Sequence, residues 1–197
     1  MILTIASFKG GVGKTTTAVH LACYFQQSEP TLLVDGDPNR AASGWHERGR
    51  LPVAVVTEKQ MARYVPQYRH IVIDTEAHPN SKDLRELADG CDLLILPSTP
   101  DALALDALML TVDALETIGA RNYRVLLSIV PPRPNHDADD VRAMLTERGL
   151  PVFKGEVRRL IAFQKAALAG VPVYEAADPR ASDAWADYVA VGEEIKA

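Results

Sequence analysis

The segment from Lys9 to Thr16, KGGVGKTT, constrains the fold more than any other part of this chain. It follows an apolar run at residues 2–8 and leads into a helical pattern that begins at Lys14, so a glycine-rich turn joins a strand directly to a helix. Glycines in such a turn let backbone N–H groups close around phosphate oxygens without clashes from Cβ atoms. The amino end of the helix adds its positive dipole and its unpaired N–H groups. The segment therefore predicts a phosphate-binding site.

The side chains of the same segment indicate a nucleoside triphosphate. Lys14 is placed to reach the β- and γ-phosphates, and the Thr15 hydroxyl is placed to bind Mg²⁺. One position departs from the general pattern G-x-x-x-x-G-K-[ST], because Phe8 stands where that pattern has its first glycine. The residues predicted to contact ATP here are Lys9, Gly10, Gly11, Val12, Gly13, Lys14, Thr15 and Thr16.

The rest of the chain alternates short apolar runs with longer helical patterns. Several runs are apolar without alternation, as expected for strands that are covered on both faces of a parallel sheet. This order predicts an α/β fold with a doubly wound, mainly parallel sheet, helices on both faces and ligands at the carboxyl ends of the strands. The predicted strands are 2–8, 31–37, 53–56, 70–75, 92–99, 124–130 and 151–153, and the predicted helices include Lys14–Gln27, Ser81–Asp89, Asp101–Ile118 and Asp137–Arg148.

Length and composition bound the alternatives. A chain of 197 residues without a repeat or linker predicts a single domain over 1–197. No apolar run approaches the roughly 20 residues that span a bilayer, so we expect no membrane partner. Cys23 and Cys91 are isolated in the sequence, which favours a reducing cytoplasm over a metal site. The net charge of −5 disfavours blanket affinity for nucleic acid but leaves room for a local basic face.

The variant K-G-G-x-G-K-T-T resembles the deviant Walker A box of the ParA/MinD family of P-loop ATPases. The resemblance extends over nearly the whole chain through LLVDGDP, IVIDT, CDLLILPSTPDALAL and QKAALAGVPVYE. It implies a slow, Mg²⁺-dependent ATPase that works as an ATP-dependent homodimer. In that family the early lysine reaches the nucleotide of the partner subunit, and the matching residue here is Lys9. The implied catalytic residues are Lys9, Lys14 and Asp37.

Two aspartates match the remaining motifs of the family. TLLVDGDP resembles the segment whose aspartate orients the attacking water and helps hold the metal, which implies Asp37, with Asp35 as the competing candidate. HIVIDTEA resembles the Walker B strand and makes Asp74 a metal-binding carboxylate that acts through water. The family usually continues with Pro-Pro, whereas Glu76 and Ala77 stand here, so the behaviour of this switch segment is open.

The adenine pocket is harder to place. The family resemblance implies that it is built from residues 128–135 and 173–182, where Pro132 and Arg133 are the candidate contacts with the base. A stiff proline-rich loop without a ligand is an equal alternative.

Features that this sequence lacks exclude some subgroups of the family. The chain has no segment before its first strand for a helix-turn-helix, and its acidic end disfavours membrane targeting of the MinD kind. The chain then resembles the short class of the family, whose members position cargo over the nucleoid. Within that class, the carboxysome-distributing (McdA) branch is the one most similar to two segments, DGDPNRAASGW and RRLIAFQKAALAGVPVYE. The resemblance implies non-specific binding of double-stranded DNA in the ATP state, nucleoid association, and a small adaptor protein that stimulates hydrolysis and links the ATPase to its cargo.

A basic cluster late in the chain is the candidate DNA face. The stretch FKGEVRRLIAFQK contains a single acid, Glu156, and its arginines are expected to open a helix that carries the later lysine near the same face. A solvated helix face is the alternative. The predicted DNA-binding residues are Lys154, Arg158, Arg159 and Lys165.

Two other functions stay open at this point. The first is a plasmid or chromosome partition ATPase of the short ParA class, which shares every motif above. The second is a metabolic ATP-dependent ligase or synthetase of the same fold, but such an enzyme needs inserted loops for a second substrate, and this chain has little length to spare.

Overall fold

A six-stranded parallel sheet forms the centre of the molecule. The computed structural model describes residues 1–77 and 81–197. The strand order is β3-β2-β4-β1-β5-β6, and every described pair of neighbouring strands is parallel. This confirms the predicted doubly wound α/β fold. The strands are β1 (Ile2–Ser7), β2 (Thr31–Gly36), β3 (Ala54–Thr57), β4 (His70–Ala77), β5 (Leu93–Ser98) and β6 (Tyr123–Leu127).

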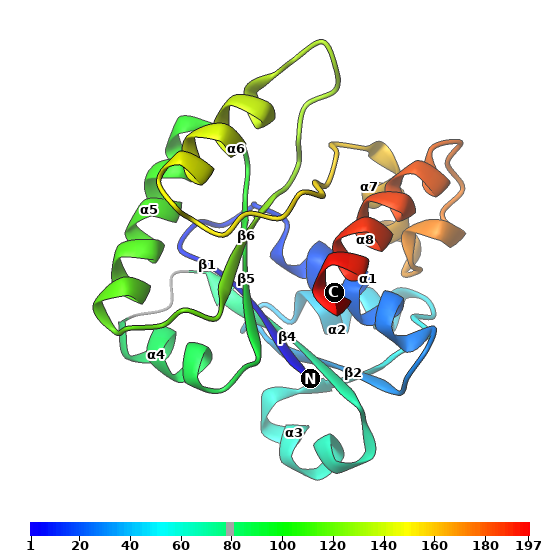
Figure 1. Cartoon of the computed structure of the whole chain (residues 1–197). Coiled ribbons are helices and arrows are strands. Elements are labelled where there is room, and N and C mark those ends of the chain that lie inside the picture. The colour runs from blue at the N-terminus through cyan, green and yellow to red at the C-terminus, as the bar shows by residue number, and fades with distance from the viewer. Residues whose placement is uncertain (78–80) are drawn as a thin grey trace.

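Helices cover both faces of the sheet (Figure 1). One layer holds α1 (Lys14–Gln26), α2 (Ala41–Arg48), α7 (Ile161–Ala169) and α8 (Ala181–Lys196). The other holds α4 (Ser81–Asp89), α5 (Ala102–Thr117) and α6 (Asp137–Glu147), while α3 (Glu58–Tyr64) packs at the β2–β3 edge. Two 3₁₀ turns, η1 (Val65–Gln67) and η2 (Val173–Glu175), complete the regular structure.

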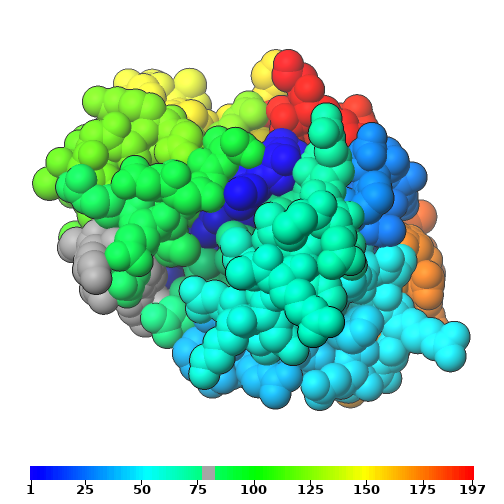
Figure 2. Space-filling view, turned by 90° about the horizontal axis from the view of Figure 1, so that it is seen from below, coloured from blue at the N-terminus to red at the C-terminus, as the bar shows by residue number. Residues whose placement is uncertain are grey.

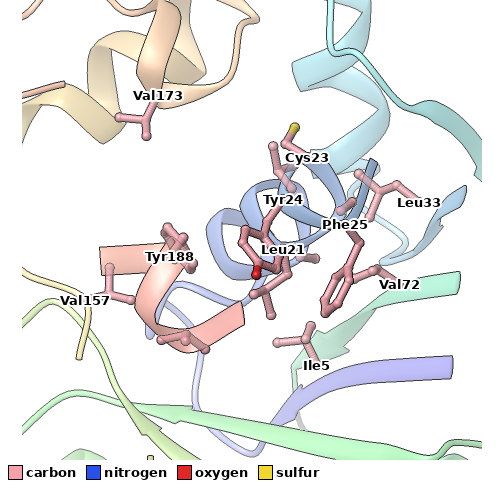
Figure 3. Packing of buried hydrophobic residues seen from close by; sticks show 14 of the residues in the cluster. Ile5, Leu21, Cys23, Tyr24, Phe25, Leu33, Val72, Val157, Val173 and Tyr188 are labelled. Carbon is pink, nitrogen blue, oxygen red and sulfur yellow. The ribbon is translucent and has the colours of Figure 1, made fainter. Parts of the chain in front are cut away.

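The larger core lies between the sheet and α1, which is buried on nearly all sides because the strands cover one side of it and α8 covers another. Figure 3 shows Leu21 and Phe25 of α1 close to Ile5 and Val72 of the strands, with Tyr188 of α8 on the other side. All five of these side chains are at most 1% exposed. Burial of this kind holds α1, and with it the preceding turn, in a fixed position over β1.

The first residues of the chain lie at the end of the molecule away from the glycine-rich turn, near the middle of that surface. Figure 2 shows them in dark blue, recessed between the teal segment around α3 and a green segment. The Met1 ammonium donates to the Arg69 carbonyl (2.9 Å), and the Asp92 amide donates to the Ile2 carbonyl (2.9 Å). The amino terminus is thus held inside the sheet. Within the described ranges, no helix has the length and apolar character needed to cross a membrane.

Most predicted boundaries agree with the structure within one or two residues. Asp101 caps α5 by accepting from the Ala104 amide (3.0 Å), and Gly119 and Gly149 adopt left-handed φ after α5 and α6. The predicted strand at 151–153 is wrong, because only Val152 forms an isolated bridge to β6. Residues 78–80, which continue the predicted switch segment after Asp74, lie outside the described residues.

Candidate nucleotide-binding site

The turn between β1 and α1 has the backbone shape that its glycines predict. Gly11 and Gly13 lie at φ 79° and 86°, a region that side chains disfavour. Gly13 is also the N-cap of α1, and no side chain of the described residues caps this helix end. The first N–H groups of α1 are therefore available to bind an anion.

The two lysines of the turn have different partners. Lys14 is 8% exposed, and its Nζ donates to the Lys9 carbonyl across the turn (3.3 Å). Burial lowers the pKa of Lys14, while the charges of Asp74 and Asp37 act against that shift. Lys9 points the other way, and its ammonium pairs with Asp101 at the start of α5 (3.1 Å). Lys14 is thus held over the turn, and Lys9 lies at its outer side.

Asp74 is the most unusual group in the site. It lies near the carboxyl end of β4, in register with Ile5 of β1 and Asp35 of β2. Its side chain is fully buried, and neither carboxylate oxygen forms a hydrogen bond of normal geometry within the described residues, although the Thr15 hydroxyl lies close by. Burial raises the pKa of Asp74 to about 7, which the nearby Thr15 hydroxyl partly offsets. A buried carboxylate with so little hydrogen bonding is costly unless a cation joins it, so Asp74 together with the Thr15 hydroxyl fits Mg²⁺.

Asp35 and Asp37 differ in what their oxygens contact. One Asp35 oxygen accepts from the Ser43 amide of α2 (2.7 Å), and the other accepts from the Asp37 amide (3.2 Å). Among the described residues, the Asp37 carboxylate bonds only to nearby Asn39, through a single oxygen, and Asp37 is partly exposed. The structure therefore gives Asp35 a structural partner at each oxygen, which favours Asp37 for contact with a ligand.

A cavity of about 230 Å³ adjoins the end of the glycine-rich turn. Its walls are mostly apolar and come from the carboxyl side of β6, the segment before α7, α7 itself and α8. Gly13 and Thr16 form one side, so the cavity lies directly beside the predicted phosphate-binding turn. The remaining lining residues are Ser128, Ile129, Val157, Arg158, Arg159, Leu160, Phe163, Gln164, Ala167 and Tyr188.

The predicted base contacts are not part of this cavity. Pro132 and Arg133 line a separate cavity of about 70 Å³, and the Arg133 guanidinium pairs with Asp139 (2.7 Å). Of the predicted segment 128–135, only its first two residues reach the larger cavity, and of 173–182 none does. Pro132 and Arg133 therefore stay predicted base contacts, and the structure adds the cavity beside the turn as a second candidate for the base.

The basic cluster is arranged differently from the prediction. Arg158 and Arg159 do not open a helix, because the backbone around them pairs with the continuation of β6 and α7 begins only at Ile161. The Arg159 amide donates to the Val130 carbonyl (2.8 Å), so this amide makes no hydrogen bond within a helix. The chain is thus extended where the sequence predicted a helical turn.

Two of the four residues predicted to bind DNA form ion pairs with carboxylates of the same chain. Arg158 makes a two-pronged bond to Asp187 (2.7 and 3.0 Å), which raises the pKa of Arg158, and Lys165 pairs with Asp178 (2.8 Å). Lys154 and Arg159 are exposed. Arg158 therefore lines the cavity beside the turn and is only partly exposed, whereas its part in DNA binding stays a prediction.

Comparison with known proteins agrees with this geometry. The profile of the CobQ/CobB/MinD/ParA nucleotide binding domain matches residues 3–173. The chain belongs to this family. Within it, the chain is 37% identical to the maintenance of carboxysome distribution protein A of Gloeobacter kilaueensis, over 98% of the chain and 93% of that protein. It is 29% identical to the protein of the same name from Halothiobacillus neapolitanus, over 88% and 86%.

Solved structures of the family share the fold. An ATP complex of a Cyanothece McdA variant matches with a TM-score of 0.78 at 18% identity, over 99% of this chain and 96% of that one. The Aquifex aeolicus cell division protein MinD also matches with a TM-score of 0.78, at 15% identity over the same shares. At such identities the likeness extends to the arrangement of sheet and helices.

Proposed function

We propose that this family member is an ATP-hydrolysing switch that dimerises with ATP, binds DNA without sequence preference in that state, and positions a cargo. The observation that supports it most is the pairing of the KGGVGKTT turn with the buried carboxylate of Asp74, whose oxygens form no hydrogen bond of normal geometry within the described residues. An anion site and a cation site then lie side by side at the carboxyl ends of β1 and β4. Mg²⁺–ATP has the charges that such a pair requires.

The residues have distinct roles in this proposal. The turn amides and Lys14 bind the phosphates, and Thr15, Asp37 and Asp74 hold Mg²⁺, the last of these through water. A magnesium ion there supplies positive charge to the β- and γ-phosphate oxygens. Asp37 orients the attacking water, since it follows the end of β2, is partly exposed and has one oxygen free of described partners.

Lys9 completes the site from the partner subunit. Its ammonium lies on the outer side of the turn and, among the described residues, bonds only to Asp101, an exposed pair that contributes little to stability. Lys9 can therefore exchange Asp101 for a phosphate of a second copy without a large cost. Hydrolysis then requires two chains, and an adaptor protein stimulates it.

The favoured cargo is the carboxysome, because the two relatives described above are named for carboxysome distribution. Plasmid or chromosome partition is the alternative, supported by 27% identity to the protein ParA of Rhizobium radiobacter over 78% of the chain. Nucleoid DNA would meet Lys154 and Arg159, with Lys165 nearby.

DNA binding in three nucleotide states tests the proposal. Filter or gel assays with double-stranded DNA at low and high salt should show retention with ATP, but not with ADP or without nucleotide. Retention should fall steeply with salt, because each phosphate contact releases counterions. Equal retention in all three states would contradict the switch, and removal of Mg²⁺ by chelation should abolish hydrolysis.

A further inference from the structure

Four large hydrophobic side chains are exposed in the described part of the chain, and they form two pairs on two helices. Leu103 and Leu110 lie on α5, Ile161 and Leu168 lie on α7, and each is between 61% and 80% exposed. In both pairs the residues are seven positions apart, about two helical turns, so each pair forms a row along one face of its helix. Because the chain itself covers neither row, both are available to another molecule.

The charged residues within the two rows have opposite signs. On α5, Asp106 is exposed between the leucines, none of the described residues pairs with it, and the helix carries no basic residue. On α7, Lys165 is exposed between the two hydrophobic residues, where it pairs with Asp178 (2.8 Å), and the helix carries no acid. The acidic row and the basic row therefore attract each other, whereas two copies of the same row repel.

The spacing of the two rows also matches when the helices run antiparallel. Each row consists of a hydrophobic, a charged and a hydrophobic residue, with steps of three and then four positions on α5 and of four and then three on α7. Reversing one helix makes the two orders equal, so hydrophobic meets hydrophobic and acid meets base at all three positions. The facing pairs are Leu103 with Leu168, Asp106 with Lys165, and Leu110 with Ile161.

One chain cannot form this contact within itself, because α5 and α7 lie on opposite faces of the sheet (Figure 1). The contact joins α5 of one copy to α7 of the next. Each added copy then keeps a free α5 at one end of the assembly or a free α7 at the other. A contact between two different surfaces therefore continues beyond a dimer.

We propose that the chain associates head-to-tail through this α5–α7 contact, with a second copy of itself as the partner. The inference goes beyond the proposed function, because the contact uses neither Lys9 nor the glycine-rich turn. It therefore requires no nucleotide and is separate from the ATP-dependent dimer. Two single helices bury less than the roughly 1,000 Å² of a stable interface, so the association is weak and depends on concentration.

Sedimentation velocity of the wild-type chain, without nucleotide or DNA, tests the contact. Over concentrations on the order of 10 μM to 1 mM, where weak interfaces associate, the mean sedimentation coefficient should rise and pass that of a dimer. Leu110→Gln removes one hydrophobic contact at an exposed position, so it should weaken the association about tenfold and leave the Tm unchanged. A wild type that stays monomeric throughout, or that stops at a dimer, would overturn the proposal.

Reversal of the two charges tests which faces meet. Asp106→Lys and Lys165→Glu each place like charges opposite each other, so either variant alone should associate at least about tenfold more weakly than the wild type. Mixed in equal amounts they should associate again, because every α5 then finds an α7 of opposite charge on the other variant. A mixture that associates no better than its two components would overturn the contact.

Glu147→Lys is the matched control, since it makes the same change of net charge at an exposed position of α6. It should associate as the wild type does, and an equal loss in this variant would mean that net charge, rather than the α5 row, governs the association. The Tm of each variant shows that it is folded. Asp106→Lys and Leu110→Gln carry the test even where Lys165→Glu loses stability with its Asp178 pair.

Discussion

Asp35 and Asp37 are two residues apart at one strand end, yet only Asp35 has a backbone donor from another element at its carboxylate. Its bond to the Ser43 amide ties β2 to α2. Asp37 has no such tie among the described residues, so its carboxylate can turn towards a ligand. Within one sequence motif, Asp35 thus has a structural role, and Asp37 is the residue that we propose for contact with the ligand.

Alanine at each position should show this difference. Asp37→Ala should still bind ATP, because the turn, Lys14, Thr15 and Asp74 remain, but should lose hydrolysis, with stability changed by less than about 0.5 kcal/mol. Asp35→Ala leaves a buried amide without an acceptor and should lower the free energy of unfolding by about 2 kcal/mol. Urea unfolding and a phosphate-release assay measure the two effects. Normal turnover in Asp37→Ala would assign the water-orienting role elsewhere.

His20 of α1 is fully buried behind the cavity beside the turn and is neutral in the folded chain near neutral pH. Its Nδ1 lies 2.7 Å from the Thr16 carbonyl, its Nε2 accepts from the Val173 amide (3.1 Å), and its ring stacks on Tyr188. Burial lowers the pKa of His20 to about 4. Protonation would remove the acceptor at Nε2 and place a charge in the core.

Stability should therefore depend on pH through His20. The pKa is lower in the folded chain than in the unfolded chain, so the unfolded chain binds the proton first. The stabilisation is complete above about pH 6.5 and is lost as pH falls towards 4, by about 3 kcal/mol in total. Urea unfolding against pH should show a shallower slope in His20→Gln than in the wild type. Equal slopes would mean that His20 titrates normally.

At the scale of elements, α7 is where the structure departs most from the sequence pattern. FKGEVRRLIAFQK resembles the start of a helix, but Val157 and Arg159 donate to carbonyls of Leu127 and Val130 at and beyond the end of β6. A pairing between segments far apart in the sequence thus overrides the local propensity. Arg158 then turns inwards to Asp187 of α8, which the sequence alone could not indicate.

Arg158 and Arg159 should consequently behave differently when mutated. Arg158→Ala leaves Asp187, which is 9% exposed, without its cation and should lower the free energy of unfolding by about 2 kcal/mol. Arg159→Ala should leave stability nearly unchanged and weaken ATP-dependent DNA binding. Thermal or urea unfolding, together with DNA retention, distinguishes them. Equal destabilisation would contradict the assignment of Arg158 to the cavity wall.

Much of the site follows from local sequence, and the rest depends on distant contacts. The glycine-rich turn, Lys14, Thr15 and the strand-end position of Asp74 could be predicted because each lies next to a strongly patterned strand or helix. The cavity beside the turn could not, since it brings together residues after β6, before α7 and on α8. The start of α5 was predictable from the Asp101 cap, whereas the bridge at Val152 depends on pairing with β6.

At the scale of the whole molecule, the proposal places the function between two chains. A net charge of −5 does not favour DNA binding by one copy. A dimer doubles the exposed basic groups around Lys154 and Arg159, and with them the number of phosphate contacts. ATP-dependent dimerisation is therefore the step on which DNA binding, hydrolysis and cargo positioning all depend in this account.

Sedimentation velocity of the Asp37→Ala variant, with and without Lys9→Ala, tests that step most directly, because the missing Asp37 prevents turnover during the run. With Mg²⁺–ATP, we expect Asp37→Ala to sediment as a dimer and Asp37→Ala/Lys9→Ala to sediment as a monomer that still binds ATP. Both should be monomers with ADP. A double variant that dimerises with ATP as well as Asp37→Ala does, or dimers of equal strength with ADP, would contradict the role of Lys9 and the ATP-driven switch.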